Sequence, residues 1–225
     1  MEETETSKTP EIDDNKEAMT KAVLYLSETL NGKAEYYIGG GLAVFVLNGS
    51  DFDRRFSDID IMVPETRVND TKIALEAGNY RFWDERSAHK NREDLVGFGG
   101  HHEYGAMDNT TNTRVGIYTF DTLPDGRIIF RQHFGEKDTS GTLVDKIHET
   151  ILPPEIRKED LFSTEPVPFK DGVIFTVTPE QIYLRKKNGQ REKDVSDFHK
   201  IESRIDHDKI AKLEAALQKI ETRVI

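Results

Sequence analysis

Residues 38–43 read Ile-Gly-Gly-Gly-Leu-Ala, and residues 55–61 read Arg-Phe-Ser-Asp-Ile-Asp-Ile. In the second stretch acidic and apolar residues alternate, and this period of two predicts a strand that carries Asp58 and Asp60 on one face. Two carboxylates side by side repel each other, which raises the pKa of one of them unless a cation lies between them. A pair of Mg²⁺ ions supplies such a charge and also binds phosphate oxygens. The stretch therefore predicts a metal site at Asp58 and Asp60, which are also candidate catalytic residues.

The glycines ahead of this strand predict a site for phosphate groups. Gly40 and Gly41 form a turn that lets the backbone come close to a phosphate. The apolar run over 42–47 predicts a short buried helix, whose N-terminus adds the positive end of its dipole. Ser57 is placed to donate a hydrogen bond to a phosphate oxygen, and Arg55 to pair with phosphate charge or with an acidic neighbour. These residues are the candidate nucleotide-binding residues of this part of the chain.

The two stretches together resemble the nucleotidyltransferase superfamily, the fold group of DNA polymerase β. Its signature is a Gly-Gly or Gly-Ser turn, a spacer, and an acidic–apolar–acidic strand, which residues 40–43 and 55–60 match. They resemble the aminoglycoside and lincosamide nucleotidyltransferases and the nucleotidyltransferase toxins of the abortive-infection type. The resemblance implies an α/β (α+β) fold, with a polymerase-β-like core around a mixed sheet and a helical C-terminal part. It also implies a nucleoside triphosphate as substrate and Mg²⁺ or Mn²⁺ as cofactor.

A third carboxylate, which the family usually supplies from a later strand, is missing from its expected place. The matching stretch is residues 115–118, and the expected acid is replaced by Gly116. Asp121 is one candidate substitute, although a regular strand places it on the opposite face unless a bulge intervenes. Glu103 on the preceding strand is the other. The resemblance therefore leaves the third metal ligand or general base open between Asp121 and Glu103.

A second stretch that resembles the family, residues 191–198, reads Arg-Glu-Lys-Asp-Val-Ser-Asp-Phe and follows the basic pair Arg185-Lys186. By the resemblance, Lys193 contacts the nucleotide phosphates, and Asp194 orients Lys193 or receives the proton of the acceptor as a catalytic residue. The alternative is a helix start with ion pairs along its face. Both interpretations stay open from the sequence.

Composition limits the function further. The chain has 225 residues with 31 Lys and Arg against 42 Asp and Glu, a net charge of −11 that disfavours nucleic acid over most of the surface. The absence of cysteine excludes a disulfide, a thiolate zinc site and a cysteine nucleophile. No apolar run has the length of a membrane span, and no signal peptide is recognisable, so we expect a cytoplasmic protein. The acceptor stays open between a small hydroxylated molecule and an RNA end; the acidic surface slightly favours the small molecule, and a local basic groove near residues 185–193 would reverse that preference.

The chain divides into four expected parts: an acidic disordered tail over 1–17, a nucleotidyltransferase core over 18–135, an irregular connector with short strands over 136–177, and a helical region over 178–225. In the core we expect helices over 19–30, 42–47 and 66–78, and strands over 36–38, 58–63, 93–104, 113–120 and 127–130. In the last part we expect a helix capped by Thr178-Pro179 and further helices over 195–205 and 209–220.

Two functions of different classes follow. The first is a metal-dependent nucleotidyltransferase that modifies a small molecule, as in antibiotic resistance, or an RNA end, as in a toxin. The second is a non-catalytic nucleotide-binding or regulatory module on the same fold, which has lost the acid at Gly116.

Overall fold

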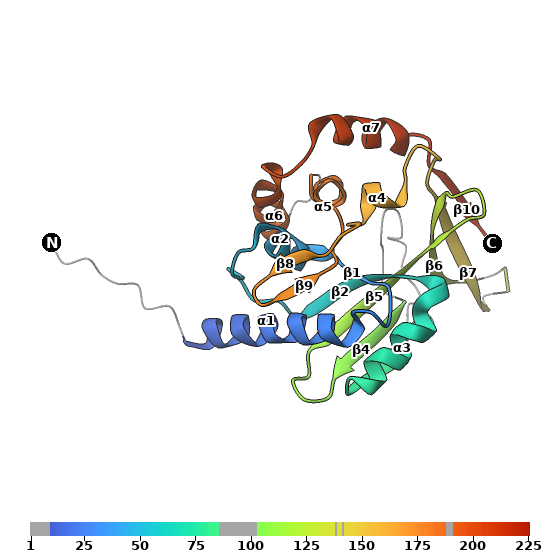
Figure 1. Cartoon of the computed structure of the whole chain (residues 1–225). Coiled ribbons are helices and arrows are strands. Elements are labelled where there is room, and N and C mark those ends of the chain that lie inside the picture. The colour runs from blue at the N-terminus through green and yellow to red at the C-terminus, as the bar shows by residue number, and fades with distance from the viewer. Residues whose placement is uncertain (1–9, 86–102, 138, 141, 188–190) are drawn as a thin grey trace.

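A mixed sheet runs through the protein, and helices lie on both sides of it (Figure 1). The computed structural model describes residues 10–85, 103–137, 139–140, 142–187 and 191–225. The strands are β1 (Tyr37–Ile38), β2 (Asp58–Pro64), β3 (Tyr80–Asp84), β4 (Tyr104–Asp108), β5 (Arg114–Thr122), β6 (Ile128–Lys137), β7 (Leu143–Ile151), β8 (Val167–Phe169), β9 (Gly172–Ile174) and β10 (Glu221–Val224). The helices are α1 (Pro10–Leu30), α2 (Gly40–Asn48), α3 (Val68–Ala77), α4 (Lys158–Leu161), α5 (Pro179–Lys186), α6 (Glu192–Glu202) and α7 (His207–Leu217), with a 3₁₀ turn over Glu65–Arg67.

Within the described residues, eight strands form one sheet in the order β1-β2-β5-β6-β7-β10, with β4 beside β5 and β3 beside β4. The pairing of β2 with β5 is parallel, and those of β1 with β2 and β4 with β5 are antiparallel. This mixed sheet, followed by the helices α5 to α7, is the expected fold class. The pairing of β8 with β9 makes a separate two-stranded sheet.

The alternating pattern of β2 has the predicted consequence. Ile59, Ile61 and Val63 are fully buried, whereas Asp58 and Asp60 are partly exposed on the other face. The chain enters this strand through α2, which is apolar on all sides because it contacts β2 on one side and α5 and α6 on the other. The predicted buried helix is therefore confirmed, and its N-terminus lies beside the two aspartates.

The N-terminal helix is longer than the sequence predicts. Helix α1 begins at Pro10, inside the segment over 1–17 that composition marks as an acidic tail. Its buried stripe, which includes Val23 and Leu26, has the predicted helical spacing. Of the strand expected over 93–104, residues 93–102 lie outside the described residues, and β4 begins at Tyr104.

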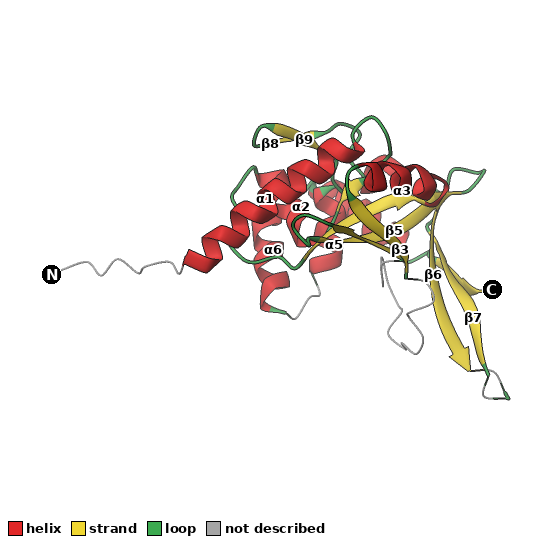
Figure 2. Ribbon diagram, turned by 90° about the horizontal axis from the view of Figure 1, so that it is seen from below, coloured by secondary structure: helices red, strands yellow, loops and turns green. Residues whose placement is uncertain are grey.

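The second half of the sheet differs from the expected irregular connector. Strand β6 extends past residue 135, where the expected core ends, and it pairs with the nine-residue strand β7 on both sides of that boundary. The sheet therefore continues into the region that the sequence predicts as a connector. Figure 2 shows these two strands reaching away from the helices. The region over 178–225 also ends in a strand, because β10 pairs with β7 from Glu221 to Val224. Backbone N–H and C=O groups on an open strand edge favour such pairing over a frayed helix end.

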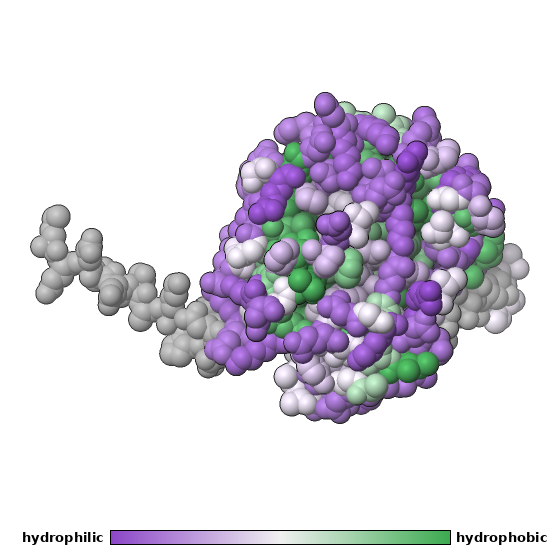
Figure 3. Space-filling model, in the orientation of Figure 1, coloured by the Kyte–Doolittle hydropathy of each residue, from purple (hydrophilic) through white to green (hydrophobic). Residues whose placement is uncertain are grey.

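The surface is polar, in keeping with the composition. On the face that Figure 3 shows, hydrophilic side chains dominate, and hydrophobic ones appear between them. None of the helices in the described part of the chain combines the length and the hydropathy needed to cross a bilayer.

Candidate active site

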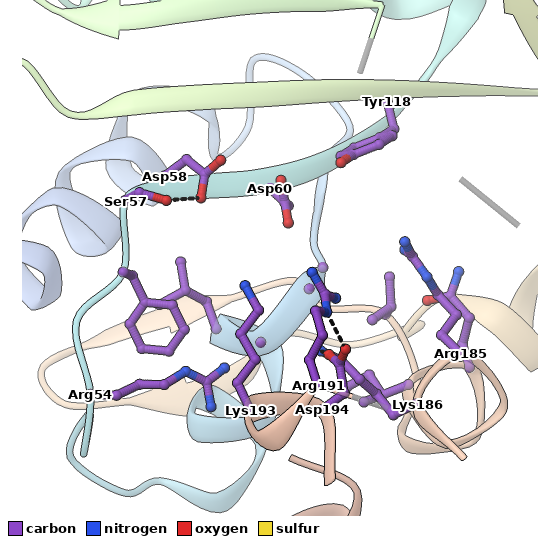
Figure 4. A pocket seen from close by; sticks show the side chains of 18 of the residues that line it. Arg54, Ser57, Asp58, Asp60, Tyr118, Arg185, Lys186, Arg191, Lys193 and Asp194 are labelled. Atoms are coloured by element: carbon purple, nitrogen blue, oxygen red, sulfur yellow. Dashed lines mark hydrogen bonds and ion pairs between the residues drawn. The ribbon is translucent and has the colours of Figure 1, made fainter. Parts of the chain in front are cut away.

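A cavity of about 470 Å³ opens where β2 faces α5 and α6 (Figure 4). Its lining comes from three parts of the chain: the glycine turn with Gly39, Gly40, Gly41 and Leu42; the strand side with Arg54, Arg55, Phe56, Ser57, Asp58, Asp60 and Tyr118; and the helical side with Val177, Gln181, Ile182, Arg185, Lys186, Arg191, Lys193 and Asp194. Residues more than 100 positions apart in the sequence thus share one site.

The two aspartates of β2 both face the cavity. Ser57 donates a hydrogen bond of 2.9 Å from its Oγ to Oδ1 of Asp58. The hydroxyl of Tyr118 on β5 donates to the carboxylate of Asp60, and the pKa of Tyr118 is raised by burial and by the nearby charge of Asp60. Each carboxylate is therefore oriented by a hydroxyl group.

The glycine turn packs directly on this pair. Gly40 has φ +62°, which disfavours other residues, and a Cβ at Gly40 would lie 2.5 Å from Oδ2 of Asp60. A Cβ at Gly41 would clash with the guanidinium of Arg54. The backbone N–H of Gly39 donates to the carbonyl oxygen of Asp60 at 2.9 Å. The glycines thus give the carboxylate of Asp60 and the guanidinium of Arg54 their places at the cavity wall.

Five charged groups of alternating sign connect Arg54 to the helical side of the cavity. Arg54 donates twice to Asp197, from Nη1 to Oδ1 at 2.5 Å and from Nη2 to Oδ2 at 2.9 Å. Lys186 lies 3.0 Å from Asp197 and also pairs with Asp194, and Nε of Arg191 lies 2.5 Å from Oδ2 of Asp194. Asp197 is fully buried and Asp194 nearly so. The two carboxylates therefore fix three cations around the cavity.

Asp194 is poorly suited to accept a proton. Burial alone would raise its pKa, but hydrogen bonds from Arg191 and Lys186 outweigh burial and leave the pKa below its usual value. Both of its oxygens already accept hydrogen bonds from these cations. A general base works best with a pKa near the working pH, and the surroundings of Asp194 move it in the opposite direction.

Among the described residues, β4 and β5 place no carboxylate in the cavity lining beside Asp58 and Asp60. Gly116 is the strand partner of Asp60 in the parallel pairing of β2 and β5, so the position beside Asp60 carries no side chain. Asp121 does not line the cavity, and its carboxylate lies 3.5 Å from Nη1 of Arg131. Glu103 is buried, also outside the lining, and accepts a hydrogen bond from Thr119. Of the candidates from sequence, the structure brings neither Asp121 nor Glu103 into the cavity.

A further buried carboxylate lies on the same face of the sheet. Gly116 pairs with Gly105 on β4, and a Cβ at Gly105 would lie 2.6 Å from Oε1 of Glu85. Arg114 donates to both oxygens of Glu85, at 2.8 and 3.1 Å. Glu85 also lies outside the cavity lining, whereas Asp58 and Asp60 of β2 belong to it.

The oxygen atoms at Asp58 and Asp60 fit a hard divalent cation. No group of three acidic, histidine or cysteine side chains able to hold a metal is present in the part of the chain that the structure describes. Mg²⁺ is commonly bound by one or two carboxylates, with the remaining ligands from water and substrate phosphates. Two carboxylates beside a cation-lined cavity match that pattern, so these residues fit the ion that the sequence resemblance implies.

Most of the predicted site residues meet in this cavity. Gly40, Gly41, Arg55, Ser57, Asp58, Asp60, Lys193 and Asp194 all line it, and Asp121 does not. Sequence reasoning missed Arg54, Tyr118 and Gln181. The position of Arg54 next to Arg55 was the only sequence signal for the first, and neither tyrosine nor glutamine carries a signal of its own in this stretch.

Comparison with known proteins supports the fold. No family model matches the chain, and no curated protein sequence matches it. The solution structure of the antibiotic-resistance factor ANT(2'')-Ia matches with a TM-score of 0.54 and 11% identity, over 90% of this chain and 92% of that chain. The crystal structure of ANT(2'')-Ia in complex with adenylyl-2''-tobramycin gives a TM-score of 0.54 and 12% identity, over 89% and 97% of the two chains. The lincomycin-bound lincosamide antibiotic adenylyltransferase LnuA gives 0.48 and 18%, over 83% and 96%.

The two ANT(2'')-Ia structures share the fold of this chain, which confirms the predicted mixed α/β fold class. The resemblance to the toxin branch stays a prediction.

Proposed function

We propose that this protein is a nucleotidyltransferase that moves a nucleoside monophosphate from a nucleoside triphosphate to a hydroxyl group of a small molecule. The observation that carries the proposal is the cavity in which Asp58 and Asp60 face a wall of cations. The fold, which matches that of ANT(2'')-Ia, raises the prior but does not by itself assign the reaction.

The charges of the cavity support a polyphosphate ligand. Six cationic side chains line the cavity, namely Arg54, Arg55, Arg185, Lys186, Arg191 and Lys193, against the three carboxylates of Asp58, Asp60 and Asp194. The whole chain carries a net charge of −11, so this concentration of positive charge is local. Arginine and lysine are the side chains that bind phosphate oxygens most strongly, and a low-dielectric cleft strengthens such contacts.

The roles of the residues follow from their places. Asp58 and Asp60 hold Mg²⁺ or Mn²⁺, and the bound ion supplies charge neutralisation and polarises the phosphoryl oxygens. Arg55 and Lys193 are exposed cations that contact the phosphates, and the backbone at Gly40 and Gly41 approaches the phosphates from the turn.

Asp194 acts as a positioning residue rather than as a base. It fixes Lys186 and Arg191 beside the phosphates by accepting a hydrogen bond from each of them. Catalysis then rests on orientation and electrostatic stabilisation, which carry most phosphoryl-transfer reactions.

The acceptor is a small hydroxylated molecule rather than an RNA end. The acidic surface opposes nucleic acid, and the basic residues near 185–193 that line the cavity face Asp58 and Asp60 inside it, where two of them, Lys186 and Arg191, pair with Asp194. ANT(2'')-Ia was solved with adenylyl-2''-tobramycin, which makes aminoglycosides the first acceptors to test.

The test measures transfer of label from each of the four nucleoside triphosphates, labelled at the α-phosphate, to a panel of aminoglycosides, lincosamides and pooled tRNA with Mg²⁺ or Mn²⁺. We expect transfer to a small molecule by the wild type and at least a 100-fold loss in Asp58→Asn and Asp60→Asn. Asp70→Asn is the matched control, because Asp70 at the start of α3 forms an exposed ion pair with Arg67 of the 3₁₀ turn, and neither residue lines the cavity. Label on tRNA alone would contradict the choice of acceptor.

The alternative is a non-catalytic nucleotide-binding module, which is favoured by one observation, the glycine opposite Asp60. Tight binding of a nucleoside triphosphate without transfer to any acceptor, unchanged by Asp58→Asn, would favour the module over the enzyme.

A further inference from the structure

Gln181 carries a buried polar atom that lacks a partner. The residue lies in the first turn of α5, lines the cavity, and is only 2% exposed. Its Nε2 donates to Sδ of Met62 at 3.5 Å, whereas its Oε1 is buried and accepts no hydrogen bond from the described part of the chain. A buried acceptor without a donor is costly, and native structures rarely keep one without a use.

The neighbour of the amide explains which atom is left over. A thioether sulfur is a weak acceptor and has no proton to donate. Exchanging the amide nitrogen and oxygen would place Oε1 against Sδ of Met62 and would still leave it without a donor. Met62 therefore favours the orientation in which Nε2 faces Sδ, and in either orientation Oε1 is the atom that lacks a donor.

The surroundings of Gln181 differ from those of the phosphate-binding residues. In Figure 4, Tyr118 and Arg185 lie at the side of the cavity away from Arg54 and Ser57. Tyr118 is the strand partner of Met62, which Gln181 contacts, and Arg185 lies one helical turn after Gln181 on α5. Together with the apolar lining residues Val177 and Ile182, they form the less highly charged side of the cavity.

The distance along β2 fits the sugar of a nucleotide. Met62 is two residues beyond Asp60 on the same face, which is roughly 7 Å along the strand. With the α-phosphate beside Asp58 and Asp60, the sugar is the next group of the nucleotide and carries hydroxyl donors. The terminal torsion of glutamine is broad, so the amide of Gln181 can rotate to meet a ligand in the cavity that its side chain lines.

We propose that Oε1 of Gln181 accepts a hydrogen bond from a ribose hydroxyl of the bound nucleoside triphosphate, and so distinguishes ribonucleotides from deoxyribonucleotides. This inference rests on the proposed function, because it takes a nucleoside triphosphate as the ligand. It assigns the two sides of the cavity: the phosphates lie toward Arg54 and Ser57, and the nucleoside lies toward Gln181.

The experiment compares the wild type with Gln181→Met, which keeps the length of the side chain and removes both amide groups. Dissociation constants are measured by calorimetry for ATP, 2'-deoxy-ATP and 3'-deoxy-ATP with Mg²⁺. We expect the wild type to bind ATP about threefold to tenfold more tightly than one of the deoxy analogues, the size of one net hydrogen bond. In Gln181→Met that preference disappears, and ATP binds as weakly as the analogue. Gln218→Met, the same change at an exposed residue after α7, keeps the preference of the wild type.

Three results would overturn the inference. The first is an equal loss of affinity for ATP and both analogues in Gln181→Met with the preference intact, which would assign Gln181 to packing. The second is a changed preference among ATP, GTP, CTP and UTP with unchanged sugar discrimination, which would assign it to the base. The third is that the correctly folded wild type binds no nucleoside triphosphate at all. This result would also refute the proposed function, whereas the first two results would leave that function intact.

Discussion

Substituting Asp194 by asparagine separates a positioning residue from a general base. The change removes the charge that holds Lys186 and Arg191. Arg191 is 68% exposed, so its ion pair contributes at most about 1 kcal/mol. Lys186 is only 13% exposed, but in the variant it still pairs with Asp197 at 3.0 Å. The free energy lost at Lys186 is therefore smaller than the cost of a buried charge with no partner, which is about 3–5 kcal/mol. We expect Asp194→Asn to lower the free energy of unfolding by about 2–3 kcal/mol.

Asp197→Asn is the comparison variant. Asp197 is fully buried and accepts two hydrogen bonds from Arg54 in addition to the contact with Lys186. Its removal leaves Arg54 without its carboxylate and leaves Lys186 with Asp194 alone, so we expect a loss of about 3–5 kcal/mol, larger than that of Asp194→Asn. Urea unfolding at neutral pH measures both values, and equal slopes would show that the two variants unfold from similar native states.

Steady-state kinetics complete the test. With displaced cations, Asp194→Asn should raise the KM for the nucleoside triphosphate about tenfold and leave the shape of the pH profile of kcat unchanged. A general base contributes about 10²–10⁴-fold to the rate. A fall in kcat of that size with an unchanged KM, together with the loss of the acidic limb of the profile, would refute the positioning role.

Two further predictions concern the glycine turn and the acidic limit of stability. Gly40→Ala introduces a methyl group against Asp60 at a positive φ, so transfer activity should fall at least tenfold. Gly49→Ala is the control, because Gly49 also has a positive φ of +60° but has open space around it, and this change should lower only the melting temperature. Equal losses of activity in the two variants would contradict the role of Asp60. Burial by itself raises the pKa of Glu149, but the hydrogen bonds from Arg131 and Arg223 outweigh burial and hold the pKa below its usual value. The ionised Glu149 therefore contributes its full stabilisation of the fold above the ordinary glutamate pKa, and this contribution is lost as the pH falls through the lowered pKa. Glu149→Gln should therefore destabilise the protein by about 2 kcal/mol at pH 7, and the difference from the wild type in urea unfolding should shrink toward pH 3.

The elements with strong periodicity were predictable from the sequence. The alternation in residues 58–63 and the apolar run over 42–47 correspond to β2 and α2. The cap of α5 also follows its sequence signal, since Oγ1 of Thr178 accepts a hydrogen bond from the backbone of Gln181. These features are local, so a single sequence contains the information that decides them.

The second half of the sheet depends on partners far away in the chain. Strands β6 and β7 are held by each other, and β10 is held by β7, which lies about 70 residues earlier. The stretch over 221–224 is exposed and has no apolar period, so only the open edge of β7 decides that it forms a strand. A sequence pattern cannot contain a signal for such a pairing.

The candidate site divides in the same way. The glycine turn and the two aspartates share a short stretch and were predictable as a unit. That Asp194 and Asp197 would be buried against Lys186 and Arg54 was not, because the same spacing is typical of a solvated helix face. The strand period of two predicts that Asp121 lies on the face opposite to the expected acid at position 116, and the structure places its carboxylate beside Arg131.

The chain of charges from Arg54 to Arg191 has a consequence for how the protein reaches its native state. It joins residues separated by about 140 positions, so the cavity wall forms only when two distant segments of the chain have come together. A ligand that contacts both the segment with Arg54 and the segment with Arg191 binds only the native fold, so it raises the melting temperature of the whole molecule rather than of one part.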